Sequence, residues 1–77
     1  MLKKIAMEAY NQFESNLNKL ENVSILLKEE KNVIYELYNK VYKIVNHVMM
    51  LDEIVYYNMI LTISSEGITK IDNLIIQ

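Results

Sequence analysis

The residues that interrupt helices most strongly are almost absent from this sequence, which contains no proline and a single glycine, Gly67. Proline and glycine are the residues that most often interrupt helices and strands. A chain that lacks both before residue 67 favours long helices joined by short polar connections. With 77 residues in total, it has room for one small domain spanning 1–77.

Composition excludes several kinds of protein. An apolar content of 52% with a net charge of −2 is typical neither of a disordered chain nor of a basic nucleic-acid-binding domain. The absence of cysteine excludes a disulfide framework and thiolate metal sites, so we expect a cytoplasmic protein. Even the most apolar window, 44–63, contains charged and amide side chains, so we expect no membrane-spanning helix and no membrane partner.

A first amphipathic helix is predicted over residues 2–20. Its apolar residues recur at helical spacing and share one face: Leu2, Ile5, Ala6, Ala9, Tyr10, Phe13, Leu17 and Leu20. The pattern stops at 21–24, where Asn22 and Ser24 are both residues that commonly cap helices. We therefore place a turn there.

A second helix is predicted to begin at Ser24 or at Asn32, which is another good capping residue. Its apolar residues alternate at intervals of three and four, as in a coiled coil. Such a stripe either faces the core of a small bundle or forms the seam of a dimer. We assign these residues to self-association: Ile34, Leu37, Val41, Ile44 and Val48.

Self-association is also expected from size. A chain this short buries only roughly 60% of the surface that it exposes when unfolded. With 52% apolar residues, it has more apolar surface than a lone monomer easily covers. We expect a homodimer or a larger assembly.

Asp52 interrupts the second helix, because it falls on the apolar stripe five turns after Ile34. A lone carboxylate buried there would be costly. Either the helix ends near 50–52 and Asp52 caps the next element, or Asp52 is buried and fixes the register with a partner. We predict the cap.

The segment 54–63 is ambiguous. Its β-branched and aromatic residues favour a strand, whereas Asn58 and Thr62, four residues apart, would form a thin polar edge on a buried helix. The sequence Ser-Ser-Glu-Gly at 64–67 either caps a short terminal helix or forms a hairpin loop. We predict a mainly all-α fold, in which a long amphipathic helical hairpin and a short C-terminal helix form a self-associating bundle. The alternative is an α+β fold with a strand or hairpin in 54–76.

No constellation of catalytic residues is visible. His47 is the single histidine, and it falls on the polar face of the second helix with Lys43 and Leu51 one turn away, neither of which completes a metal site. No glycine-rich phosphate loop and no activated nucleophile are present. We expect a protein that is not an enzyme and that has no catalytic residue, metal or cofactor.

Tyrosines flank the apolar stripe of the second helix. Tyr35, Tyr38 and Tyr42 share one edge, and tyrosine is common at protein interfaces because it joins a large apolar ring to a polar tip. We predict that this edge binds a partner protein, with Glu36 and Lys40 on its rim. The alternative is that the tyrosines line the edge of an ordinary core.

These observations together predict a small protein that binds another protein and modulates it, most simply by inhibition. Antitoxins, immunity proteins and phage-encoded inhibitors of host defence act in this way. One alternative is a small dimeric winged-helix-like transcriptional regulator, with a recognition helix over 33–47 and a wing near 61–67. Against it, Lys40 and Lys43 are the only cations on the outer face of that helix, and the chain has no arginine. The other alternative is a structural assembly subunit.

Overall fold

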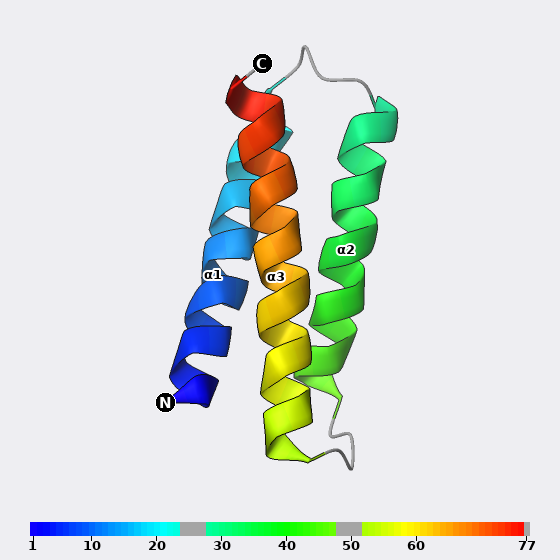
Figure 1. Cartoon of the computed structure of the whole chain (residues 1–77). Coiled ribbons are helices and arrows are strands. Elements are labelled where there is room, and N and C mark those ends of the chain that lie inside the picture. Colours follow the sequence, from blue (N-terminus) through cyan, green and yellow to red (C-terminus); the bar gives the residue numbers. More distant parts are fainter. Residues whose placement is uncertain (24–27, 48–51, 77) are drawn as a thin grey trace.

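The computed structural model of the chain contains three helices, α1 (Leu2–Glu21), α2 (Lys28–Asn46) and α3 (Glu53–Ile76). It describes residues 1–23, 28–47 and 52–76. The helices run up, down and up, so α1 and α3 are parallel and α2 is antiparallel to both (Figure 1). The described residues contain no strand, and the predicted all-α bundle is confirmed.

Helix α1 follows its predicted bounds almost residue for residue. The centre of its apolar stripe forms the core face, where five side chains are buried: Ala6, Tyr10, Phe13, Leu17 and Leu20. The helix ends at Glu21, after which the backbone amides of Asn22 and Val23 donate hydrogen bonds of 3.2 and 3.0 Å to the carbonyls of Lys19 and Leu20. These bonds satisfy carbonyl groups that the helix end would otherwise leave unpaired.

Helix α2 begins before Asn32, which lies inside the helix and does not cap it. The other predicted cap, Ser24, lies outside the described residues. Glu29 and Glu30 occupy the first turn, where the partial positive charge of the helix N-terminus stabilises carboxylates. The buried residues Ile34, Val41 and Ile44 place the predicted stripe of α2 in the core of the single chain.

Asp52 caps α3, as predicted. Its carboxylate oxygen Oδ1 accepts a 2.8 Å hydrogen bond from the amide of Ile54, and its carbonyl accepts the first helical bond, 2.9 Å from the amide of Tyr56. The Tyr56 hydroxyl in turn donates to the carbonyl of Val45, 3.2 Å away. Tyr56 therefore ties the last turn of α2 to the first turn of α3.

The C-terminal region differs from the prediction, because 53–76 is one continuous helix of 24 residues, the longest in the chain. Neither a strand nor a short terminal helix forms, and 64–67 is neither a cap nor a hairpin loop. The two small residues Ser64 and Gly67 are instead buried on the packing face of α3, together with Ile60, Ile63 and Ile71. Burial against two other helices outweighs the modest helix propensity of the β-branched residues.

Both other helices pack on α3, and the contact between α1 and α3 is the most extensive of the three. Gly67 makes that approach close, because the ring of Phe13 occupies the space where a Cβ at position 67 would lie. The predicted hairpin of the first two helices is thus a minor contact. Helices α1 and α2 meet chiefly through large aromatic side chains.

No helix in the described part of the chain is both long enough and apolar enough to cross a membrane.

Replacing Gly67 by alanine should destabilise the fold. The new methyl group would overlap the Phe13 ring, which is completely buried. Overpacking typically costs ~1–3 kcal/mol, against a gain in helix propensity of ~1 kcal/mol, so we expect a net loss of about 1 kcal/mol. Urea unfolding followed by circular dichroism measures it. The exposed neighbour Ser65→Ala is the control, and Phe13→Leu should relieve part of the Gly67→Ala loss. A Gly67→Ala variant more stable than wild type would contradict this packing.

Replacing Ser64 by alanine should have the opposite effect. The Ser64 side chain is fully buried, and its Oγ has no hydrogen-bond partner. Alanine keeps the Cβ, removes the unpaired hydroxyl and is a better helix former, so we expect stabilisation by ~1 kcal/mol. The same unfolding experiment checks it, with Ser65→Ala again as the reference. A loss of stability would mean that the hydroxyl is hydrogen-bonded in solution.

Candidate functional site

The predicted tyrosine edge of α2 faces α1. The ring of Tyr38 stacks on Tyr10, with centroids 6.1 Å apart and planes 12° apart, and meets Phe13 edge-on at 5.6 Å and 80°. Its hydroxyl donates a 2.7 Å hydrogen bond to Oε2 of Glu14 and lies 3.4 Å from the hydroxyl of Tyr10. Tyr38 is therefore an aromatic spacer between the two helices.

The electrostatics of this edge follow from its burial. Burial raises the pKa of Tyr38, and the hydrogen bonds to Tyr10 and Glu14 act in the same direction because they favour the neutral hydroxyl. Burial also raises the pKa of Tyr35, helped by the nearby carboxylate of Glu21 at the end of α1. These two half-buried tyrosines thus fasten α2 to α1, and Tyr42 is the exposed member of the edge, at 48%.

Glu36 and Lys40 lie on the other flank of α2. They line a hollow with Val33 and Leu37 of α2 and with Glu66 and Lys70 of α3. The predicted site is consequently divided, since the tyrosines turn toward α1 and their predicted rim turns toward α3. The assignment of both groups to partner binding stays a prediction.

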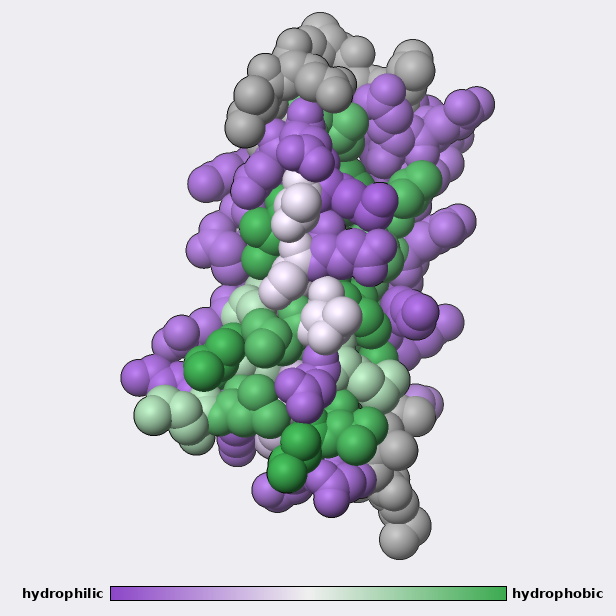
Figure 2. Space-filling model, in the orientation of Figure 1, coloured by the Kyte–Doolittle hydropathy of each residue, from purple (hydrophilic) through white to green (hydrophobic). Residues whose placement is uncertain are grey.

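Exposed apolar side chains are concentrated at one end of the bundle. Figure 2 shows them gathered over the N-terminal parts of α1 and α3, whereas polar side chains cover most of the opposite end of this face. Ile54 is 64% exposed and Val55 is 48% exposed, although both belong to the most apolar run of the sequence. Apolar patches of this kind often mark interaction sites.

A groove follows the seam between α2 and α3. It consists of three adjoining hollows, because Val33 and Lys70 are shared by the first and second hollows and Lys40 by the second and third. We call it the α2–α3 groove. Its two ends are mainly apolar, and its middle carries charges of both signs.

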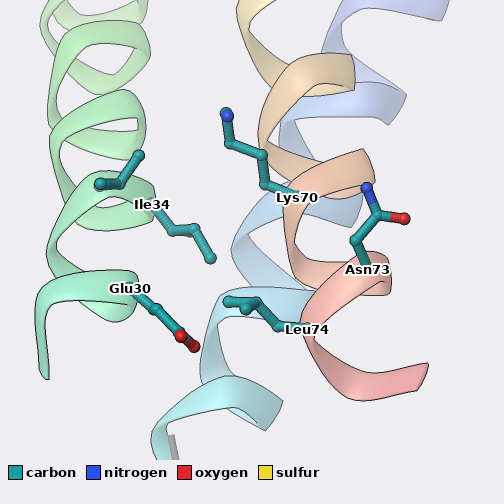
Figure 3. Close-up of a pocket in the computed structure, with 6 residues that line it drawn as sticks. Glu30, Ile34, Lys70, Asn73 and Leu74 are labelled. Carbon is teal, nitrogen blue, oxygen red and sulfur yellow. The ribbon is translucent and has the colours of Figure 1, made fainter. Parts of the chain in front are cut away.

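Figure 3 shows the first end of this groove. Ile34 of α2 and Leu74 of α3 extend toward one another across the gap, and Glu30 and Asn73 lie at its edges. Lys70 reaches over the gap between the helices, toward the charged middle. At the other end, Val55, Met59 and Ile63 of α3 provide the apolar lining: together with Asn58, Thr62 and Lys40 they surround the third hollow.

The residues predicted for self-association are largely used within the chain. Ile34, Val41 and Ile44 are buried in its core, and Leu37 is half-buried at the groove. Val48 lies outside the described residues. A second copy would reach this seam only if the helices of one chain separated, and the assignment stays a prediction.

His47 is exposed, as expected from its place on the polar face. The expected wing of a winged-helix domain does not form, because 61–67 lies in the middle of α3. In the described part of the chain, no three His, Cys, Asp or Glu side chains are grouped as the ligands of a metal would be.

Sequence reasoning missed the α3 side of the groove, namely Val55, Met59, Glu66 and Lys70. Apolar residues on all sides of 54–63 were the available signal, since a helix covered on two sides only must expose some of them. Glu66 and Lys70 were missed because a break was predicted at 64–67. They share a face with Met59 only if the helix is continuous.

The raised pKa values of Tyr35 and Tyr38 predict a loss of stability in alkali. The unfolded chain loses its tyrosine protons near pH ~10, below the folded-state pKa, so the free energy of unfolding should fall as the pH rises above that value. The free energy of unfolding of Tyr38→Phe should be ~1 kcal/mol lower than that of the wild type at neutral pH, because its hydrogen bonds are missing. It should fall less steeply than that of the wild type as the pH rises above ~10. Urea unfolding at several pH values measures both effects. Tyr42→Phe, at the exposed end of the edge, is the control for loss of a tyrosine hydroxyl. A slope for Tyr38→Phe equal to that of the wild type would contradict the role of Tyr38.

Comparison with known protein families, with curated proteins and with solved structures gives no match, so the role of this site rests on its own geometry.

Proposed function

We propose that this chain is a non-enzymatic protein that binds another protein and inhibits it, as antitoxins, immunity proteins and phage-encoded inhibitors of host defence do. The observation that carries the proposal is the α2–α3 groove, with its apolar ends and charged middle. Val33, at the groove, is left 48% exposed.

The shape of the groove suits a helix. Amphipathic helices commonly bind with their apolar face in a hydrophobic groove on a partner protein. The lining residues of α3 run from Val55 to Leu74, which at 1.5 Å per residue corresponds to roughly 28 Å. That length accepts five turns of a partner helix.

The residues that line the groove indicate which residue types the partner helix should carry. Its two ends should be apolar, to cover Val33 and Leu74 at one end and Val55 and Met59 at the other. Its middle should carry both an acidic and a basic residue, because Lys40 and Lys70 alternate with Glu36 and Glu66. Such charges mainly select the partner and set the register, whereas the apolar ends supply most of the affinity.

The rest of the proposal is supported by the sequence. The lone His47 has no nucleophile or second ligand one turn away, and the chain has no cysteine, which supports a non-catalytic role in the cytoplasm.

A capture experiment tests the proposal. The immobilised chain is exposed to bacterial lysates, the bound proteins are identified, and the activity of each is assayed with and without the chain. Val33→Lys is the groove variant, and Tyr42→Lys is its matched control, because both residues are 48% exposed and lie on opposite flanks of α2. We expect Val33→Lys to weaken binding at least ~10-fold, since it places an unpaired charge in an apolar interface, and Tyr42→Lys to bind like wild type.

The outcomes separate the two faces of α2. Loss of binding in Tyr42→Lys alone would move the site to the tyrosine edge. Full binding by both variants would contradict both sites. A captured protein whose activity does not change would contradict inhibition. Circular dichroism of each variant confirms that the fold is intact.

A further inference from the structure

We infer that a second copy of this chain covers a separate surface, which we call the α1–α3 patch. The patch lies at the N-terminal ends of the two parallel helices, where Ile5 and Ile54 are 46% and 64% exposed. Half-buried apolar residues of the same two helices, Leu2 and Tyr57, surround a shallow cleft beside Ile54. Figure 2 shows this apolar surface at the lower end of the molecule.

Helix α3 explains why the patch exists. Its N-terminal half is apolar on nearly all sides, a pattern typical of a helix that is surrounded by others. Helices α1 and α2 cover two of its sides. The third side, which includes Ile54, faces solvent in the single chain.

The charges beside the cleft favour a second copy as the occupant. Lys3 of α1 lies on one side of the cleft and Glu53 of α3 on the other, and both are exposed. In a two-fold dimer the same surface of both copies forms the interface, so a charge on one copy can be paired only by an opposite charge from the same surface of the other copy. This cleft carries one charge of each sign and is therefore complementary to itself.

The parallel arrangement of α1 and α3 supplies the geometry. Both helices begin at the same end of the bundle (Figure 1), and Lys3 from α1 and Glu53 from α3 line the same cleft. A two-fold axis in the interface, running along the seam between the two helices, places Lys3 of each copy opposite Glu53 of the other. The apolar centres of the two patches then meet across the axis.

This dimer is independent of the proposed function. The α1–α3 patch and the α2–α3 groove lie on different sides of α3, since Ile54 and Tyr57 line the first and Met59 and Ile63 the second. A dimeric chain would therefore still present the groove to its partner.

Sedimentation equilibrium of the purified chain tests the inference. We expect a dimer at tens of micromolar, and Ile54→Glu should raise its dissociation constant at least ~10-fold, because a charge enters the apolar interface. The variant should stay folded, since the residue is exposed and a carboxylate in the first turn of a helix is favourable. Val33→Lys, at the groove, is the matched control and should leave the dimer unchanged.

Charge exchange provides the second measurement. Lys3→Glu alone should weaken the dimer, and the double variant Lys3→Glu with Glu53→Lys should restore it. A wild-type chain that stays monomeric, an Ile54→Glu variant that dimerises normally, or a double variant weaker than Lys3→Glu alone would each overturn the inference. Because Ile54→Glu retains the groove, its binding in the capture experiment distinguishes failure of the dimer from failure of the proposed function.

Discussion

The contact between Phe13 and Gly67 sets the spacing of the whole bundle. The Phe13 ring of α1 fills the space that the Cβ of any residue other than glycine at position 67 would occupy. The two helices can therefore approach closely. The same ring packs edge to face with Tyr38 of α2, so this side chain of α1 contacts both other helices. Interiors are packed as densely as organic crystals, and the positions of α1, α2 and α3 are therefore coupled through this ring.

The sequence predicts the elements that carry an uninterrupted local signal. Helix α1 has a clean apolar stripe and the break after it is sharp, so both of its ends are predictable. Asp52 is predictable as a cap, because burying a lone carboxylate on an apolar stripe would be costly and a cap is the simplest alternative. In each case the local physics and the final fold agree.

The prediction for α3 fails because its decisive residues act at long range. Gly67 looks like a helix terminus in the sequence, but its lack of a side chain serves the approach of Phe13, which is distant along the chain. Ser64 looks like a cap and is instead buried on the same face. The site is split for a related reason: spacing along α2 places Glu36 and Lys40 near the tyrosines, but only the positions of α1 and α3 decide which flank faces which neighbour.

The parallel pairing of α1 with α3 has a consequence for how the chain folds as it is synthesised. The most extensive helix contact joins α1 and α3, which are separated in sequence by α2, so it cannot form as a local hairpin. When the chain has been synthesised only through α2, α1 has no α3 to pack on, and α1 and α2 contact each other mainly through aromatic side chains. Almost no core has then formed to offset the entropy that is lost when distant parts of the chain are brought together. Folding of this small domain therefore depends on the synthesis of α3, because both other helices pack on it.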